Sequence, residues 1–448
     1  MIVPTTRLIF WSGVLLMSGA LAVLLEPGAA VPVLALILLY LILVMLDATN
    51  VYGSLNEVAA DFPESVRLTK DKDSEITIAL TSSKSDGKSR RLRVGLDLPS
   101  EIESPQEAIL TTLPGNGTQV NVGWPCAPRI RGNYPLASVY LETTSPLGLW
   151  AHHRTVPAET QLHVYPNIQK EQRNLAAFFL NRGTAGIHAQ RQVGKGRDFE
   201  QLREYIPGDS YQDIHWKATA RRNHPVSKVF QIERTQEIYV IIDSSRLSAR
   251  RVTDPEDGKT TTQLERFINS AMVLGLIAQK QGDLFGLITF SDRVQSFVRA
   301  KNGTAHFATC RDALYTLEPK SVNPDFEELC AFVRLRLRKR ALLFVLTNLD
   351  DPVLAESLVN NVDLLSKNHL VLVNMVTPPN IGPMFSNPDA TETDDLYTQL
   401  GGHVEWQNLV QLKKILHYHN VTMTLITHEE MAPALVSQYV NQKQRQLL

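Results

Sequence analysis

Two long uncharged runs near the start of the chain constrain its fold more than any other feature. Residues 8–25 and residues 31–46 contain no charged side chain, and residues 26–28 between them read Glu-Pro-Gly, a turn composition. At a rise of about 1.5 Å per residue, each run forms a helix that nearly spans the hydrocarbon core of a bilayer. The pattern predicts a transmembrane helical hairpin over residues 1–46.

A cleaved signal peptide is the alternative for the first run, but the run lacks a small-residue cleavage site and the second run follows at once. Arg7 precedes the first span, whereas the turn carries only Glu26. By the positive-inside rule, both ends of the hairpin and the soluble domains then face the cytoplasm. We therefore expect a protein of the inner (cytoplasmic) membrane with two spans, and the lipid membrane as one partner.

Charge and cysteine content narrow the function of the remaining chain. The 45 Lys and Arg residues are balanced by 46 Asp and Glu residues, so a bulk basic surface for nucleic acid is excluded. The three cysteines, Cys126, Cys310 and Cys330, are too few for a disulfide framework or a four-cysteine zinc site. We expect no nucleic-acid partner.

The soluble part begins with a region rich in β structure. Residues 47–175 contain short alternating runs, such as 75–80 and 92–98, that are separated by turn residues. Several short strands at this spacing predict an antiparallel β-sandwich-like domain.

The C-terminal half has a different pattern, in which strand-like and helix-like segments alternate. Residues 236–448 alternate short apolar runs, such as 238–243 and 284–290, with segments of helical periodicity. Runs buried on both faces between helices predict a doubly wound α/β domain. Residues 391–402 are polar and are expected to form a loop.

Residues 176–235 link the two domains and carry a dense motif. Nine Lys and Arg residues alternate with six Asp and Glu residues over 187–234, with Tyr205, Tyr211 and Trp216 among them. Two interpretations stay open: an internal ion-pair network anchored on the aromatic residues, which clasps the two domains, or a partner-docking face. Catalysis by the acid and base groups Asp209, Asp213 and His215 is a third, although no nucleophile stands beside them.

The same stretch resembles the hallmark of domain-of-unknown-function family 58, in residues 199–205, 207–209 and 214–221. The resemblance implies a two-span N-terminus, a β region and a C-terminal domain similar to von Willebrand factor type A. It also implies a partnership with a MoxR-type AAA+ ATPase and other membrane proteins. The motif residues, with a role in partner binding or structure, are Arg197, Phe199, Glu200, Arg203, Tyr205, Gly208, Asp209, Asp213, Trp216 and Arg221.

A type A domain binds a divalent cation such as Mg²⁺ through Asp-x-Ser-x-Ser after its first strand, with a distant Thr and Asp. Asp243 and Ser245 match that sequence here, but Leu247 stands at the third position and Asn348 where Asp is usual. Thr304 is the candidate threonine. We expect no cofactor, and the alternative is a degenerate Mg²⁺ site at Asp243, Ser245 and Asn348.

The expected fold is multidomain: a transmembrane helical hairpin, a β-sandwich-like domain and a doubly wound type A-like α/β domain. The expected function is a membrane-anchored, non-enzymatic interaction or adaptor protein that acts with a MoxR-type AAA+ ATPase. A cation-dependent ligand-binding module and a carboxylate-based hydrolase are the alternatives. No GxSxG, HExxH or phosphate-loop sequence supports an enzyme.

Overall fold

The computed structural model divides into two compact units, Met1–Asn167 and Ile168–Leu448, which we describe separately. The structure describes residues 1–56, 58–82, 89–114, 119–169, 171–173, 193–207, 210–231, 236–253, 260–378, 381–383 and 393–445.

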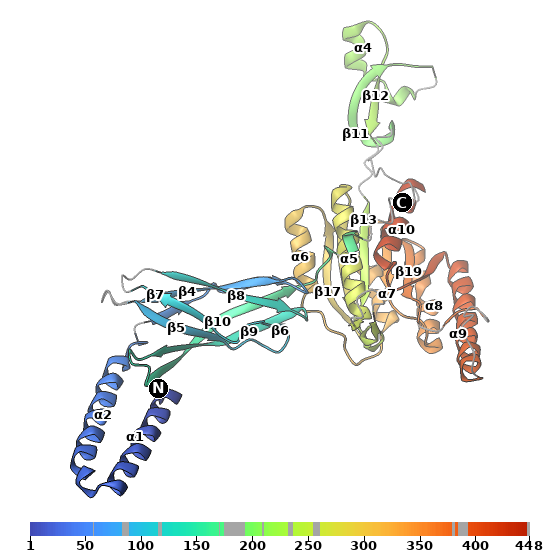
Figure 1. Ribbon diagram of the computed structural model, residues 1–448. Helices are drawn as coiled ribbons and strands as arrows, with labels where there is room; N and C mark the ends of the chain where they lie inside the picture. Colours follow the sequence, from blue (N-terminus) through green and yellow to red (C-terminus); the bar gives the residue numbers. More distant parts are fainter. Residues whose placement is uncertain are drawn as a thin grey trace. The chain divides into compact units, whose positions relative to one another are not determined.

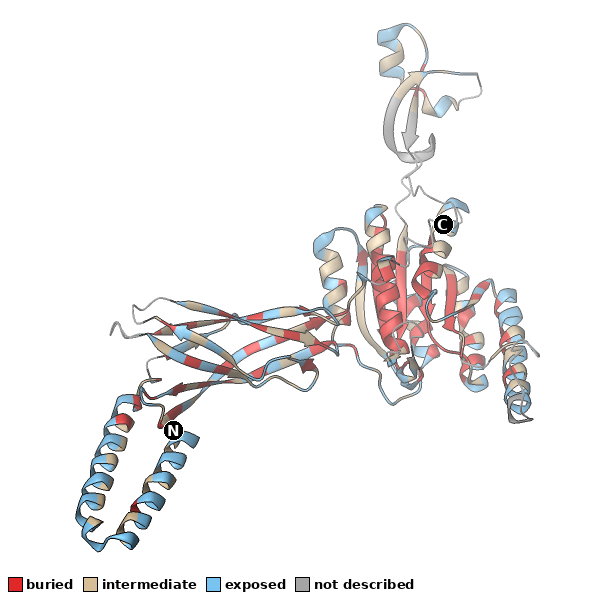
Figure 2. Ribbon diagram, in the orientation of Figure 1, coloured by how far each residue is buried: buried red, intermediate tan, exposed pale blue. Residues whose placement is uncertain are grey.

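Two helices open the first unit: α1 (Thr6–Leu25) and α2 (Ala30–Val51), joined by the short turn η1 (Pro27–Ala29) (Figure 1). Both are long and apolar enough to cross a membrane, and apolar side chains are exposed along both (Figure 2). Such a surface is stable in lipid rather than in water. The predicted hairpin is confirmed, and the protein is membrane-associated.

Two sheets form the β domain of the first unit. One has the order β1-β10-β9-β5-β7 with β3 beside β10, and the other has the order β2-β4-β8-β6. Alternate residues of β4 and β8 turn inward, so that Ile76, Ile78 and Trp124 are buried in one core, as the sandwich-like prediction requires. The strands are β1 (Ile2–Pro4), β2 (Val58–Asp61), β3 (Ser65–Thr69), β4 (Ser74–Ser82), β5 (Arg90–Leu96), β6 (Ile102–Glu103), β7 (Ile109–Leu113), β8 (Val120–Pro128), β9 (Gly132–Thr144) and β10 (Trp150–Tyr165).

Strand β1 was not predicted, because it precedes α1 and three residues carry no readable alternation. It pairs antiparallel with β10, with Ile2 opposite His152. β3 pairs with β10 in parallel, so this sheet is mixed rather than purely antiparallel. The start of α1 therefore adjoins this sheet through β1, whereas β2, the strand after α2, belongs to the other sheet.

Side chains also join the hairpin to the β domain. Asp47 is 2% exposed and accepts a hydrogen bond from Ser145 Oγ at 2.5 Å. Trp150 Nε1 donates to the carbonyl oxygen of Val44 at 3.0 Å. Because Asp47 finds its partner in the β domain, α2 continues past residue 46, the predicted end of the hairpin, to Val51.

The second unit contains a six-stranded sheet in the order β17-β16-β13-β18-β19-β20, parallel except for the edge strand β17. Its strands are β13 (Glu237–Asp243), β16 (Leu284–Phe290), β17 (Val294–Lys301), β18 (Leu342–Leu346), β19 (Leu370–Val376) and β20 (Val421–Ile426). Its helices are α5 (Gln263–Lys280), α6 (Thr304–Leu314), α7 (Phe326–Arg336), α8 (Pro352–Ser366), α9 (Thr393–Tyr418) and α10 (Met431–Arg445).

Strand β13 shows why this sheet is covered on both faces. Ile238, Val240 and Ile242 belong to one core cluster, which includes residues of α5, α6 and α10. Tyr239 and Ile241 point the other way, into a second cluster with residues of α7, α8 and α9. The doubly wound α/β prediction is confirmed.

One prediction for this domain was wrong in detail. Within the expected loop at 391–402, residues 393–402 are instead the start of α9, since Leu396, Leu400 and Val404 recur at helical spacing and the helix tolerates Gly401 and Gly402.

Smaller elements complete the second unit. A separate two-stranded hairpin, β11 with β12, carries the family motif. The elements of this motif hairpin are β11 (Val193–Glu204), η2 (Tyr211–Asp213), α4 (Trp216–Arg222) and β12 (Val226–Gln231). Three short elements follow β13 in the α/β domain: η3 (Arg246–Ala249), β14 (Arg251–Thr253) and β15 (Thr260–Thr262).

Candidate functional site

Asp243 lies at the carboxyl end of β13, where doubly wound sheets bind ligands. Its side chain is fully buried, and its Oδ1 accepts a hydrogen bond from the Ser245 backbone N–H at 2.8 Å. Its Oδ2 accepts one from Thr347 Oγ1 at 2.6 Å. Burial raises the pKa of the Asp243 carboxyl, and these hydrogen bonds oppose the rise. The Asp243 carboxyl group thus accepts hydrogen bonds from the residues that follow β13 and β18.

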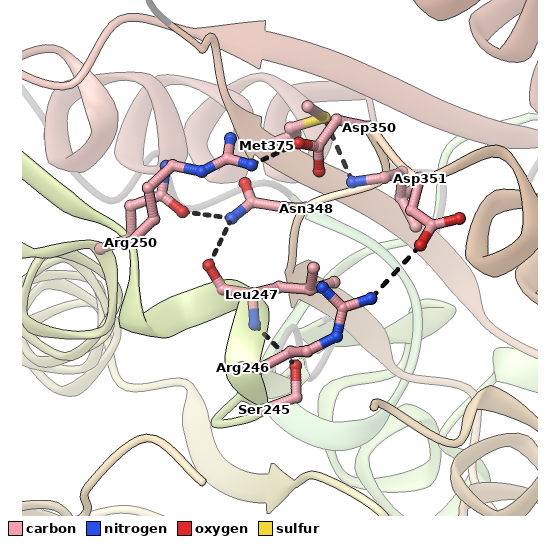
Figure 3. Close-up of polar contacts among 10 residues, drawn as sticks. Ser245, Arg246, Leu247, Arg250, Asn348, Asp350, Asp351 and Met375 are labelled. Carbon is pink, nitrogen blue, oxygen red and sulfur yellow. Dashed lines mark hydrogen bonds and ion pairs between the residues drawn. The ribbon is translucent and has the colours of Figure 1, made fainter. Parts of the chain in front are cut away.

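Ser245 and Asn348 lie at the same edge and are also engaged. Ser245 Oγ accepts from the Leu247 N–H at 3.3 Å and so caps η3. Asn348 Nδ2 donates to the Leu247 carbonyl at 3.3 Å and to Gln263 Oε1 (Figure 3). The structure therefore places the three predicted residues, Asp243, Ser245 and Asn348, at the same end of the sheet. Each of them makes hydrogen bonds to backbone groups of the loops there.

Thr304 does not join them. Strand β17 runs antiparallel to β16, so its last residue, Lys301, pairs with Phe285 near the start of β16. Thr304 begins α6 just after that point, at the end of the sheet opposite to the strand ends where Asp243 lies. The loop that does meet this edge carries Val322, whose carbonyl accepts from the Arg246 N–H at 2.9 Å.

Two arginine–aspartate pairs cross the same edge. Arg250 Nη2 lies 2.5 Å from Asp350 Oδ2, and Arg246 Nη2 lies 3.3 Å from Asp351 Oδ2 (Figure 3). In each pair the arginine comes from the segment after β13 and the aspartate from the segment after β18. Sequence reasoning missed the Arg250–Asp350 pair, because no local pattern marks partners so far apart.

These residues do not fit a divalent cation. Both Asp243 oxygens accept protein hydrogen bonds, buried Leu247 occupies a ligand position, and two guanidinium groups flank the edge. A hard cation needs several oxygen ligands, and a nearby positive charge opposes it. Within the described residues no cluster of three or more His, Cys, Asp or Glu side chains could hold a metal ion.

The motif hairpin has a small core of its own. Ile214 and Val226 are buried, and Ile214 forms a β-bridge with Ser227. His215 Nδ1 accepts from the Ala218 N–H at 3.0 Å and caps α4. Thr219 Oγ1 accepts from the Val226 N–H at 3.1 Å and fixes α4 beside β12.

Two aromatic residues of this hairpin point into solvent. Trp216 is 69% exposed and Tyr211 is 76% exposed, and the Tyr211 ring stacks on Tyr205 with 6.2 Å between centroids. Within the hairpin itself Trp216 is thus not a buried anchor, and the choice between a clasp of the two domains and a docking face stays a prediction. The hydrophobic area of Trp216 and Tyr211 faces outward beside the exposed cations Lys217 and Arg221.

The other predicted motif residues are distributed around this module. Arg203 lies near the end of β11, and its Nη1 donates a hydrogen bond to the Glu204 carbonyl at 3.3 Å. Asp213 is the last residue of η2. Arg197, Phe199 and Glu200 belong to β11, but their side chains lie outside the described residues, as do Gly208 and Asp209 entirely.

Residues 201–384 match the family model described as "Protein of unknown function DUF58". The "Uncharacterized protein YeaD" of Bacillus subtilis (strain 168) is 27% identical over 116 residues, which are 25% of this chain and 28% of that protein. The matched part is thus about a quarter of either chain.

Two of the solved structures that match part of the chain come from Bacteroides. An aerotolerance-related membrane protein from Bacteroides fragilis has a TM-score of 0.30 at 13% identity, covering 46% of this chain and 99% of its own. BatB from Bacteroides thetaiotaomicron has a TM-score of 0.28 at 15% identity, covering 47% and 99%. The SpRpn10 VWA domain has a TM-score of 0.27 at 14% identity, covering 46% and 95%.

The type A-like fold of this chain rests on its own sheet, in which the first strand, β13, is central and the order reverses on its two sides. The motif hairpin and the strand edge at Asp243 both fall within the matched segment. Residues 201–384 of the chain therefore match the family of unknown function DUF58, and the chain has a von Willebrand factor type A-like domain.

Proposed function

We propose that this protein is a membrane-anchored adaptor without catalytic activity, whose motif hairpin binds a MoxR-type AAA+ ATPase. The observation that carries the proposal is the exposure of Trp216 and Tyr211, at 69% and 76%, in the middle of the family motif. Large aromatic side chains are costly to leave in water and are favoured in the centres of protein interfaces. The resemblance to the family supplies the partner class.

The way the hairpin holds these side chains supports a docking role. The His215 cap and the Ile214–Ser227 bridge fix the start of α4, so Trp216 is presented on ordered backbone. A preformed docking side chain loses little conformational entropy on binding. The adjacent Lys217, Arg221 and Arg222 favour an acidic partner surface, because complementary charge speeds encounter.

The same geometry argues against a hydrolase. His215 Nδ1 is occupied by the cap of α4, so that nitrogen is not available as a base. Asp213 closes η2, and within the described part of the motif no Ser, Thr or Cys side chain lies in hydrogen-bonding contact with a carboxylate or His.

We also propose that the adaptor works without a bound divalent cation, since the edge at Asp243 is closed by its own hydrogen bonds and arginine pairs. For orientation we propose the inner membrane, with both soluble units in the cytoplasm. The pairing of β1 with β10 supports one side for both ends of the hairpin, and Arg7 near that end supports the cytoplasmic side.

Co-purification of the full chain from detergent with the ATPase tests the docking proposal. Trp216→Ala should lower recovery of the ATPase by at least about tenfold, as expected for a central aromatic contact. Tyr140→Ala is the matched control, because Tyr140 is 49% exposed on β9 of the other unit. Equal recovery with Trp216→Ala and with the unaltered chain would refute docking through this hairpin.

A further inference from the structure

Charged side chains separate by position in the α/β domain, although they balance over the whole chain. Helices α5, α7, α8, α9 and α10 pack along the sheet and end near the amino ends of its parallel strands (Figure 1). Lys443 of α10 shows this arrangement, because its Nζ lies 2.7 Å from Oδ2 of Asp283, the residue before β16. We call this end of the domain, formed by the starts of the parallel strands and the ends of these helices, the amino edge.

Exposed cations gather at the amino edge. Residues 334–340, at the end of α7 and before β18, read Arg-Leu-Arg-Leu-Arg-Lys-Arg, whereas the first turn of α7 carries Glu327 and Glu328. The helix dipole favours cations in a last turn, but residues 338–340 lie beyond the last turn of α7. The exposed basic residues at this edge are Lys280, Arg334, Arg336, Arg338, Lys339, Arg340, Lys367, Lys413, Lys414 and Arg445.

The domain itself does not neutralise the run at residues 334–340. Lys339 Nζ lies 3.8 Å from Glu237 Oε1, and both groups are near the start of β13. The four arginines of the run have no hydrogen-bond or ion-pair partner for their guanidinium groups among the residues that the structure describes. Like charges this close repel one another, so an anion bound from outside the domain stabilises the run.

An exposed apolar side chain lies within the run. Leu335 is 76% exposed between Arg334 and Arg336, whereas Leu337 is 6% exposed and packs in the core. Cations next to an exposed apolar residue suit the boundary of a bilayer, where guanidinium groups meet phosphates and apolar groups meet the acyl chains. The composition of the run therefore favours a lipid surface as the source of the anion.

We propose that the amino edge binds the phosphate headgroups of an anionic lipid bilayer, with residues 334–340 as the main contact. The protein is membrane-associated through α1 and α2, so its tether holds a bilayer at a high effective concentration. The cations are spread over the ends of five helices. This spread matches a surface that offers many phosphates side by side better than it matches a single bound anion.

This contact is separate from the transmembrane hairpin and from the docking proposed for the motif hairpin. It depends on the fraction of anionic lipid, because each cation near such a surface strengthens binding by about fivefold. Salt weakens it, since charges are screened over about 10 Å at 0.1 M. The lipid composition of the membrane then sets how firmly the α/β domain is held to it.

A fluorophore within the run tests the proposal in the full chain. Leu335→Cys is labelled with a nitrobenzoxadiazole dye, and the native Cys126, Cys310 and Cys330 are buried and do not compete. In nanodiscs with nitroxide-quencher headgroups, replacing about 30% of the phosphatidylcholine by phosphatidylglycerol should raise the quenching at least about threefold. The rise should disappear in about 0.5 M salt. Val353→Cys, at a 74% exposed position in the first turn of α8 at the opposite end of the domain, is the matched control and should show no rise.

Charge substitutions separate the amino edge from other basic surfaces. In the Leu335→Cys background the rise should be abolished by a fourfold variant that combines Arg334→Gln, Arg336→Gln, Arg338→Gln and Arg340→Gln. It should be kept by a motif-hairpin variant that combines Lys217→Gln, Arg221→Gln and Arg222→Gln.

Four results would each overturn the proposal. They are equal quenching in the two lipid mixtures, an equal rise at Val353→Cys, a rise that survives the fourfold variant, and a rise that is lost in the motif-hairpin variant. A signal at Leu335→Cys that changes only when the ATPase is added would likewise overturn it, in favour of an acidic protein surface.

Discussion

Arg250 and Asp350 are 100 residues apart in the sequence, yet Nη2 of the arginine lies 2.5 Å from Oδ2 of the aspartate. The pair ties the segment after β13 to the segment after β18. The same two segments hold Ser245 and Asn348, two residues of the expected cation site, and the guanidinium group of Arg250 joins them.

Removing this pair should destabilise the domain in a cation-independent way. Arg250→Ala leaves the Asp350 carboxylate, only 20% exposed, without its counter-ion, and should cost about 1–2 kcal/mol of unfolding free energy. Arg246→Ala breaks a pair whose side chains are 49% and 35% exposed, and should cost less than about 1 kcal/mol. Thermal melts of the detergent-solubilised chain measure both.

The same melts test the cation. The melting temperature of the unaltered chain should be equal in a chelator and in millimolar Mg²⁺ or Mn²⁺, because a ligand raises stability only where it binds the folded state. A rise of several degrees with either metal would contradict the assignment of a cation-free edge.

Asp47 should be required for the junction between the hairpin and the β domain. It accepts hydrogen bonds from Ser145 Oγ at 2.5 Å and from the Leu147 N–H at 3.2 Å. Asp47→Ala leaves those donors unsatisfied in a buried place and should cost about 1–3 kcal/mol. Hydrogen exchange should rise at residues 145–150. Thr49→Ala, on the exposed side of the same helix end, should change neither quantity.

Gly286 should tolerate no side chain. A Cβ atom there would lie 2.8 Å from the Ala300 backbone nitrogen and closer still to the Tyr239 ring. Gly286→Ala should therefore lower the unfolding free energy by about 1–3 kcal/mol through overpacking. Gly401→Ala is the opposite case: nothing lies within 4 Å, so alanine should stabilise α9 by up to about 1 kcal/mol. Equal melting temperatures for the two variants would be inconsistent with this packing.

His369 should make the second unit sensitive to mild acid. Burial, with Arg340 nearby, lowers the pKa of His369 in the folded state. The unfolded chain, with an ordinary His pKa of about 6.5, then binds more protons than the folded chain as the pH falls below that value. Stability is complete above the unfolded pKa and is lost as the pH falls from there toward the folded pKa.

The variant His369→Gln should therefore lose less stability than the unaltered chain between about pH 7 and pH 5. His417→Gln, at an exposed position, should keep the full pH dependence. The pKa of His152 in the other unit is also lowered by burial and acts in the same direction, so the difference between variants is the informative quantity.

The sequence by itself determined the elements whose pattern is local. The uncharged runs at 8–25 and 31–46 determine α1 and α2, because no other structure satisfies an apolar backbone in lipid. The apolar run at 238–243 favours β13, because a short run rich in β-branched residues is typical of a strand buried on both faces. Asp243 and Ser245 were found for the same reason, since they follow that strand directly.

The tertiary structure decided what depends on residues distant in the chain. Strand β1 exists because β10 offers it an edge, and α9 starts at Thr393 although its composition resembles a loop. The exposure of Trp216 and the pairing of Arg250 with Asp350 likewise leave no local signal. The direction of a side chain and the pairing of distant charges are set only when the strands and loops are brought together. The sequence alone therefore does not predict that Arg250 and Asp350 pair beside the expected cation site.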